Sequence, residues 1–322
     1  MSELPNMAIS DHDHSAESEN ELEATELSEE NILADYDEDS DEIELLHMRL
    51  KDIPSLGLEK FPNIKKLCLR QNRIARIEGL ESLTGLMDLD FYDNRISRIE
   101  NLEQLTDLES LDFSFNTIRE IENLEALTRL KNLYFVQNKI SKIKNLDTLT
   151  DLINLELGAN RIRVIENLNN LVNLEQLWLG KNKITELQNL ENLKNLKILS
   201  IQSNRITRIK GLEGLVNLEE FYISHSGINE IEGFENNLKL RVIDVSNNYI
   251  KKIENISHLT NLEEFWASNN QIDDFEDLVK LRNLDNLTTV YFEGNPIQTE
   301  NQTTYRLKVK TYLPQLMQID AT

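Results

Sequence analysis

The stretch LINLELGANRIRVIENLNNLVN, residues 152–173, recurs in close copies along most of the chain. Its asparagine, Asn160, belongs to a series that repeats every 22 residues, is replaced once by Ser226, and ends with a longer interval before Asn295. The series consists of Asn72, Asn94, Asn116, Asn138, Asn160, Asn182, Asn204, Asn248 and Asn270. A fixed period of this length indicates a solenoid, in which each unit buries its apolar face only against its neighbours.

The apolar residues of each unit keep fixed places relative to the asparagine. Counted from it, positions −8, −5, −3, +2, +5, +8 and +11 are almost all apolar, which is the LxxLxLxxN pattern of leucine-rich repeats. The LxL part predicts a short strand with inward leucines, and the spacing of three after the asparagine predicts short helical turns. We therefore predict an α/β leucine-rich-repeat solenoid of about twelve 22-residue repeats, with a parallel concave sheet, short helical or 3₁₀ convex segments and capped ends.

The asparagine column should hold the backbone together. Each side-chain amide can bond backbone groups that would otherwise be buried unpaired, and the amides continue from unit to unit. Ser226 interrupts the column with a shorter side chain, so we expect weaker local packing there.

The two ends of the repeat region depart from the pattern. Residues 44–63 read as a degenerate N-terminal capping repeat, in which Leu58 and Phe61 keep phase but His47 falls where a core leucine belongs. Leucine-rich repeats are predicted over residues 64–297. Residues 298–322, with a helix expected in their middle, read as the C-terminal cap, because open solenoid ends must be covered.

Much of the net charge of −23 comes from the N-terminal end. Residues 1–44 contain 17 Asp and Glu and no Lys or Arg, so residues 1–43 are predicted to form an acidic disordered tail. Such a tail reads as a solubilising leader, with a regulatory or targeting role as the alternative. The absence of a long apolar run, of a basic-then-apolar N-terminus and of any cysteine besides Cys68 favours an intracellular protein without a membrane span.

The residues expected to face the concave side lie at −6, −4 and −2 from each asparagine. These 33 positions hold six of the ten Trp and Tyr residues of the chain, and eight acids against two bases. The aromatic residues are Tyr92, Tyr134, Trp178, Tyr222, Trp266 and Tyr291. The acids are Asp88, Asp90, Asp112, Glu156, Glu220, Asp244, Glu264 and Glu293, and the bases are Lys66 and Arg70. This composition predicts a protein-binding face, because Trp and Tyr dominate binding hot spots. The alternative is that the aromatics pack on one another and the acids keep an exposed sheet soluble.

Other chemistries find little support in the sequence. Bases recur at +1 and acids at +6, which we expect to form surface ridges that neutralise each other, and the acidic hollow beside them argues against nucleic acid. The five histidines show no metal-ligand spacing, and no phosphate-binding glycine loop or serine nucleophile motif appears. Paired carboxylates such as Asp88 and Asp90 lie on an open sheet, so hydrolysis is the weakest alternative. We predict no catalytic residue, no metal and no cofactor.

Several stretches resemble one particular family. LCLRQN (67–72), LGKNKIT (179–185), LSIQSNR (199–205), KKIENISHLT (251–260) and the ending LPQLMQIDAT (313–322) are similar to the leucine-rich-repeat regulatory subunits of protein phosphatase 1. The resemblance implies a non-enzymatic partner that binds the phosphatase catalytic subunit across the concave face and controls its activity, maturation or localisation. It also implies a ternary complex with an inhibitor subunit of the same phosphatase, a role in the cell cycle and mitosis, and a location in the nucleus and cytoplasm.

The contact residues that the resemblance implies lie on the concave positions. They are Asp112, Tyr134, Glu156, Trp178, Asp244, Glu264, Trp266 and Tyr291, to which the composition of the concave face adds Tyr222. At the positions of Tyr134 and Trp178 the family frequently has Phe, so the chain departs from the family there. A structural adaptor of a ribonucleoprotein or axonemal assembly is the alternative, although that class has no general reason to carry an aromatic and acidic column.

Overall fold

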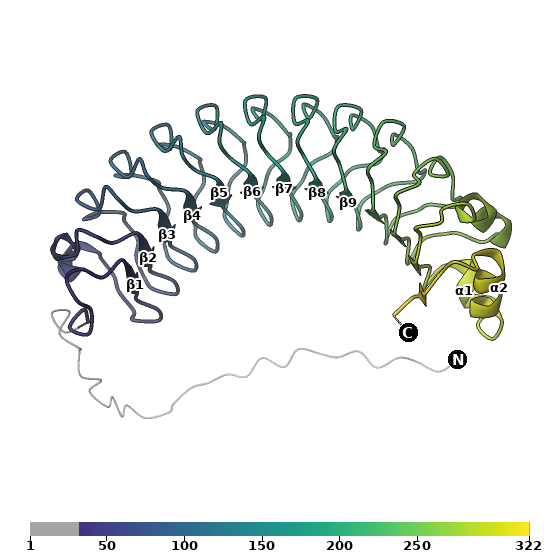
Figure 1. The fold of residues 1–322 in the computed structure, drawn as a ribbon, viewed down its shortest axis with the longest axis horizontal. Helices are drawn as coiled ribbons and strands as arrows, with labels where there is room; N and C mark the ends of the chain where they lie inside the picture. Colours follow the sequence, from purple (N-terminus) through teal and green to yellow (C-terminus); the bar gives the residue numbers. More distant parts are fainter. Residues whose placement is uncertain (1–31, 322) are drawn as a thin grey trace, which may run out of the picture.

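The structure, a computed structural model, describes residues 32–321 as an arch whose inner side is lined by strands (Figure 1). These residues form one parallel sheet of 13 strands that follow one another in chain order. The strands are β1 (Glu42–Glu44), β2 (Lys66–Cys68), β3 (Asp88–Asp90), β4 (Ser110–Asp112), β5 (Asn132–Tyr134), β6 (Asn154–Glu156), β7 (Gln176–Trp178), β8 (Ile198–Ser200), β9 (Glu220–Tyr222), β10 (Val242–Asp244), β11 (Glu264–Trp266), β12 (Thr289–Tyr291) and β13 (Gln318–Ile319). The helices are η2 (Pro54–Leu56), η3 (Leu58–Lys60), η4 (Phe275–Leu281), α1 (Pro296–Thr299) and α2 (Tyr305–Tyr312).

The strands confirm the predicted solenoid. From β2 to β10 each strand pairs in register with the strand 22 residues further on, as Leu155 does with Leu177. The middle residue of each strand is buried while its two neighbours face the hollow, as in Asn154–Glu156. In the core, the rings of Phe91, Phe113 and Phe135 stack with centroids 5.6 Å apart. The core is therefore a long row of equivalent side chains behind the sheet.

The asparagine column is present as predicted. In Asn160, Nδ2 donates to the carbonyls of Phe135 (2.7 Å), Leu157 (3.1 Å) and Gly158 (3.1 Å), and Oδ1 accepts from the amide of Ile140 (3.0 Å). One side chain thus joins its own unit to the preceding one and satisfies four backbone groups that face away from water.

The convex side has the short turns that the spacing of three residues predicts, without a regular helix between β2 and β11. Between β2 and β11 it consists of single turns, such as those closed by the amides of Leu127 and Leu130 on the carbonyls three residues before. The chain enters each set of turns through a left-handed residue, as at Asn123 with φ 57°, which interrupts helical geometry. Nδ2 of Asn123 donates to the carbonyl of Ile99 (2.7 Å). Asn101, Asn145, Asn167, Asn189 and Asn255 repeat this bond, so a second asparagine column lies on the convex side.

The N-terminal end corrects two expectations. Strand β1 begins at Glu42, inside the range 1–43 predicted as the tail, most of which lies outside the described residues. The interval from β1 to β2 is 24 residues, so Leu45 and not His47 occupies the core position. His47 is exposed and left-handed, with φ 58°, which is the conformation of the residue before each column asparagine.

The edge of the sheet at β1 is covered by the chain that precedes it. The hydroxyl of Tyr36 donates to the carbonyl of Glu44 (2.9 Å) and accepts from its amide (3.1 Å), while Leu33 is buried against the core. These contacts satisfy backbone groups that an open edge would leave free.

At the other end, helix η4 accounts for the longer interval between β11 and β12. Beyond β12, helices α1 and α2 and strand β13 close the stack. Oδ1 of Asp320 accepts from the amides of Phe292 (2.8 Å) and Glu293 (3.0 Å). The C-terminal segment therefore satisfies part of the backbone of the last repeat, as a cap requires.

The unit that carries Ser226 contains two breaks in the pattern. The Ser226 hydroxyl is buried without a hydrogen-bond partner, and its neighbour Asn204 is partly exposed although the other column asparagines are buried. Asn237 takes the +11 position, where most units have leucine, and its fully buried Oδ1 is also unpaired. The expectation of weaker local packing thus agrees with missing hydrogen bonds at this unit.

Replacing Ser226 with Asn should restore the column and raise the free energy of unfolding by about 1–2 kcal/mol, because it pairs buried backbone groups. The midpoint of urea denaturation, followed by circular dichroism, measures the gain. Asn160→Ser is the reverse control and should lower the midpoint. An unchanged midpoint in Ser226→Asn would show that the interruption costs nothing.

Candidate protein-binding face

The −4 positions form one continuous row along the middle of the hollow. Register pairs each member with the next, for example Asp112 with Tyr134, Tyr134 with Glu156, and Glu156 with Trp178. The row runs Asp90, Asp112, Tyr134, Glu156, Trp178, Ser200, Tyr222, Asp244, Trp266 and Tyr291. Eight of the nine predicted contact residues belong to this central row, and the ninth, Glu264, lies beside it on β11.

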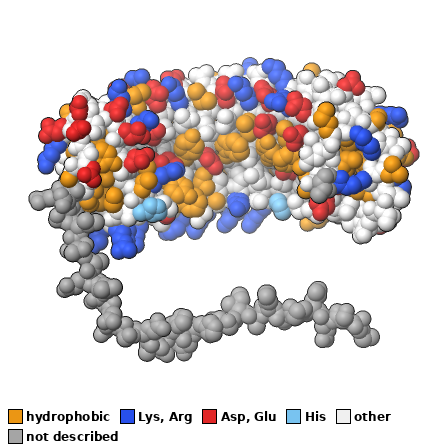
Figure 2. Space-filling model, turned by 60° about the horizontal axis from the view of Figure 1, so that its bottom comes forward, with side chains coloured by type: hydrophobic (Ala, Val, Ile, Leu, Met, Phe, Trp, Pro, Cys, Tyr) orange, Lys and Arg blue, Asp and Glu red, His pale blue; other side chains and the backbone are white. Residues whose placement is uncertain are grey.

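Figure 2 looks into the hollow and shows apolar side chains along its middle, with acids and bases around them. Successive members of the central row lie on adjacent strands, which parallel pairing places about 4.8 Å apart. The sheet therefore turns a 22-residue sequence period into a surface of closely spaced side chains.

The N-terminal half of the row carries an acidic cluster, Asp88, Asp90, Asp112 and Glu156, around a hollow of about 410 Å³. Arg70 is the base among these acids. Its Nε lies 2.6 Å from Oδ2 of Asp90 and its Nη2 lies 3.5 Å from Oδ2 of Asp112. The other oxygens of Asp90 and Asp112 accept the backbone amides of Tyr92 (2.9 Å) and Ser114 (2.7 Å). Four acids thus share one arginine.

The other two carboxylates of the acidic cluster, Asp88 and Glu156, form no ion pair within residues 32–321, although the charges of Lys66 and Arg70 act to lower the pKa of Asp88. Burial raises the pKa of Asp88, Asp90 and Glu156, and the charge of Asp112 adds to the rise in each case. Burial also raises the pKa of Tyr134, whose hydroxyl accepts from Nδ2 of Asn154 (3.3 Å). A carboxylate that is partly removed from water and lacks a counter-charge favours a cation, so this cluster suits a basic side chain of a partner.

The C-terminal half carries an aromatic cluster of Tyr222, Trp266 and Tyr291. Their ring centroids lie 6.0 Å and 5.7 Å apart in sequence order. Two acids at the −6 positions hold the rings: the Tyr222 hydroxyl donates to Oε2 of Glu220 (2.7 Å) and the Trp266 indole to Oε2 of Glu264 (2.9 Å). Burial and the carboxylate of Glu220 raise the pKa of Tyr222, so its proton stays in place. The rings are therefore fixed before any partner arrives, which lowers the entropy cost of binding.

Two predicted contact residues differ from the others in their surroundings. Asp244 is 8% exposed, because it lies on the strand between Tyr222 and Trp266, whose rings approach each other across it. Its Oδ1 accepts the amide of Ser246 (2.9 Å). Trp178 is partly exposed and packs on no other ring within the described part of the chain, and it lies between the two clusters. The binding role of all nine predicted residues stays a prediction.

Sequence reasoning missed some of the residues that shape this face. Arg70 was counted as one of two bases but not as the centre of the acidic cluster, where its guanidinium also lies 4.6 Å from the Tyr92 ring centroid. Phe115 packs on Tyr92 from a left-handed loop position outside the strands, with centroids 4.8 Å apart. A sequence signal for Glu220 and Glu264 exists in the repeated triplets EFY (220–222) and EFW (264–266). Residues two apart in a strand share a face, so each glutamate lies beside its aromatic ring.

Two further observations concern the described residues as a whole. No group of three or more His, Cys, Asp or Glu within residues 32–321 is placed to hold a metal ion. No helix in that range is long and apolar enough to cross a membrane.

Comparison with known proteins first gives the class. The leucine-rich-repeat family model matches residues 84–178, and the model for two copies of leucine-rich repeats matches residues 194–236 and 238–280. An internalin of Listeria monocytogenes superposes with a TM-score of 0.72 and 23% identity, over 92% of this chain and 94% of that one. A leucine-rich-repeat protein of Leptospira interrogans gives a TM-score of 0.67 and 22% identity, over 84% and 81%. The chain belongs to the leucine-rich-repeat proteins.

Two curated relatives are more specific. The protein phosphatase 1 regulatory subunit SDS22 of Schizosaccharomyces pombe is 52% identical over 53 residues, 16% of each chain. The subunit of that name in Saccharomyces cerevisiae is 54% identical over 50 residues, 15% of each. The chain thus matches about a sixth of the length of these relatives, and the resemblance to phosphatase regulatory subunits is confirmed over that stretch. Both relatives are named as regulatory subunits, in agreement with the prediction of a non-enzymatic protein.

Replacing Glu156 with Gln should stabilise the fold near neutral pH by roughly 0.5 kcal/mol or less. The folded state raises the pKa of this carboxyl, so its favourable contribution is present below the unfolded pKa and is lost as pH rises through the folded pKa. The difference between variant and parent should therefore vanish in acid, grow as pH rises from the unfolded to the folded pKa, and stay constant above the folded pKa. Denaturation midpoints from pH 3.5 to 7.5 measure it.

Glu125→Gln changes an exposed glutamate without an ion pair and is the matched control, with no expected effect on the midpoint. A loss of stability in Glu156→Gln at neutral pH would show that the carboxylate has a compensating partner.

Proposed function

We propose that this chain is a non-catalytic regulatory subunit that binds the catalytic subunit of protein phosphatase 1 through its concave face. The similarity to the two SDS22 subunits supports the identity of the partner. The aromatic cluster is the main support for the concave face as the binding surface. Its three large rings stay partly exposed and are held in place by hydrogen bonds and by each other. Preformed aromatic anchors of this kind usually supply most of the binding energy of an interface.

The two clusters favour different parts of a partner. Aromatic rings fill apolar surface hollows, whereas the acidic cluster attracts lysine or arginine and sets orientation. The two clusters together extend from β3 to β12, nine strand spacings or about 43 Å, so a partner that covers both must have a large surface. A folded catalytic subunit fits this requirement better than a short peptide does.

The finer consequences of binding rest on the resemblance alone and stay predictions. They are control of phosphatase activity, maturation or localisation, a ternary complex with an inhibitor subunit, a role in mitosis, and a location in nucleus and cytoplasm. Each of these roles is compatible with binding of the phosphatase on the concave face.

Changing Trp266 and Tyr291 together to Ala should weaken binding of the phosphatase catalytic subunit by at least about 100-fold, since truncating one hot-spot aromatic costs about 2 kcal/mol. Isothermal titration with purified catalytic subunit measures the affinity, and circular dichroism with a thermal melt checks the fold.

Tyr249→Ala provides the matched control. Tyr249 is an exposed aromatic, 54% accessible, at a loop position outside the strands, and its loss should leave the affinity unchanged. Parental affinity in the double variant would rule out the aromatic cluster as the contact. Absence of binding by the parent chain would rule out the partner itself.

A further inference from the structure

One flank of the arch carries a row of bases that have no ion-pair partner within residues 32–321. The row, called the basic rim, consists of Arg73, Arg95, Lys139, Arg161, Lys183 and Arg205, each one residue after a column asparagine or its equivalent. All six are exposed or partly exposed. The surrounding positions add little negative charge. Between residues 71 and 207, the −1, +1 and +3 positions, counted from each column asparagine, contain a single acid, Asp93. The rim is therefore a strip of nearly unopposed positive charge.

The ion pairs of the structure leave the basic rim out. The acids at +6 are predicted to neutralise the rim, but four of the six pair with bases at +4 instead. For example, Arg76 Nε lies 2.8 Å from Glu78 Oε1, and Arg208 Nη2 lies 2.7 Å from Glu232 Oε2. Within residues 32–321 none of the six rim side chains forms a salt bridge or a side-chain hydrogen bond. The expectation of mutual neutralisation is wrong, and the rim keeps its charge.

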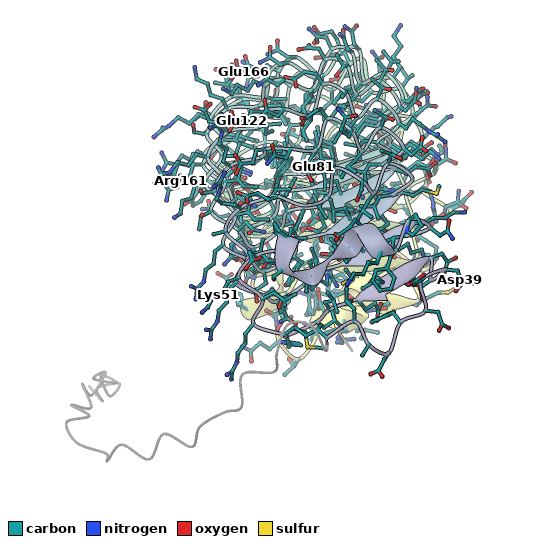
Figure 3. The ribbon with its side chains drawn as sticks, turned by 90° about the vertical axis from the view of Figure 1, so that its left-hand side faces the viewer. Asp39, Lys51, Glu81, Glu122, Arg161 and Glu166 are labelled. Atoms are coloured by element: carbon teal, nitrogen blue, oxygen red, sulfur yellow. The ribbon has the colours of Figure 1, made fainter. Side chains whose placement is uncertain are left out.

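The figures show how this charge is arranged. In Figure 2 basic side chains gather along the lower border of the hollow, beside the apolar and acidic side chains of its floor. In Figure 3 the labelled Lys51 and Arg161 lie on one flank, and Asp39 lies on the opposite one. Arg49 and Lys51 of the first repeat, both exposed and unpaired, extend the rim to the N-terminal end of the arch.

The chain contains a segment of matching charge. Residues 1–31 have ten Asp and Glu and no Lys or Arg. Their junction with the solenoid is fixed, because Leu33 is buried in the core and Tyr36 is bonded to Glu44 of β1. The segment therefore starts beside the first repeat, where Arg49 and Lys51 begin the row.

The acidic segment, residues 1–31, is long enough to reach along the whole basic rim. The rim spans about seven strand spacings from the first repeat, or roughly 35 Å, whereas 31 extended residues reach about 100 Å. A tether of this kind gives an effective concentration in the millimolar range, so weak surface pairs can add up to occupancy.

We propose that the acidic N-terminal segment, residues 1–31, docks along the basic rim of its own solenoid. The rim borders the central row, so the docked segment occupies one side of the concave face. It then competes with any acidic ligand for the rim and leaves the aromatic cluster open. Nucleic acid is disfavoured as the occupant, because the adjacent acidic cluster repels phosphate.

Zero-length carbodiimide coupling of the full chain tests this contact, since it joins lysine amines only to carboxylates in direct contact. Peptide mass spectrometry of the monomer band should find Lys139 and Lys183 joined to acids of residues 1–31. Lys251 and Lys252, which lie beyond the rim, should show no such products. The yield should fall severalfold in 0.5 M NaCl, because salt screens exposed charges.

Charge reversal of the rim arginines gives the decisive comparison. Arg95→Glu, Arg161→Glu and Arg205→Glu together keep both lysine reporters and should reduce their products at least tenfold. The matched control, Arg76→Glu, Arg98→Glu and Arg208→Glu, changes the net charge equally but alters the +4 bases, and should keep the parental yield. Circular dichroism checks that each variant is folded.

Equal yields in the two triple variants, or products spread evenly over all lysines, would overturn the proposal. A second measurement uses a labelled 20-residue polyglutamate and a 20-nucleotide single strand, each titrated onto the full chain. A variant with the ten acids of residues 1–31 changed to Asn and Gln should bind polyglutamate at least tenfold more tightly than the parent. Unchanged polyglutamate binding, or tight binding of the nucleotide strand by the parent, would show that the segment does not occupy the rim.

Discussion

The structure depends on the hydrogen bonds of one asparagine per repeat. Where the chain leaves a strand and turns behind the sheet, backbone carbonyls and an amide face the core and cannot reach water. An amide side chain is suited to this place because it carries both donors and an acceptor. In Asn160 these groups bond two successive units, so the side chain that closes one turn also sets the position of the next. The regular stacking of the strands follows from this repeated joint.

Regular stacking in turn allows each position of the repeat to serve one purpose. The strand centre and the +2 and +5 positions build the core, the −4 position builds the central row, and the +1 position builds the basic rim. A substitution at an exposed position leaves the stacking of the strands intact, because the stacking depends on the core and on the asparagine column. The acidic cluster and the aromatic cluster can therefore coexist on one sheet with a basic strip beside them.

The parts of the structure that repeat could be predicted from the sequence, and the parts that do not repeat could not. The period alone located the strands, the asparagine column and the concave residues. The first repeat was misplaced because its interval to the second is two residues longer, which moved Leu45 into the core in place of His47. On the convex side a spacing of three residues fits single turns as well as short helices, and between β2 and β11 the structure has single turns. The left-handed asparagines that separate the turns were visible as a second column only once their bonds were known.

The candidate site, too, could be predicted only in part. Its positions followed from the alternation of side chains along a strand, but the state of each side chain depends on neighbours one or two repeats away. Asp244 was expected to be available, yet the rings of Tyr222 and Trp266 meet across it. The bases of the rim were expected to be neutralised, yet the acids select partners at +4. Which side chains pair or cover one another depends on the distances between them in the folded chain, and the repeat period does not give these distances.

The two breaks in the repeat lie where the face is most aromatic. Ser226 follows the strand of Tyr222, and Asn237 precedes the strand of Asp244, so the unit with unpaired buried groups stands directly behind the aromatic cluster. In a solenoid a weak unit is not compensated by distant contacts, because stability is transmitted only through adjacent interfaces. Adjustment of the arch should therefore occur most easily between β9 and β10. A partner that meets both clusters spans this joint.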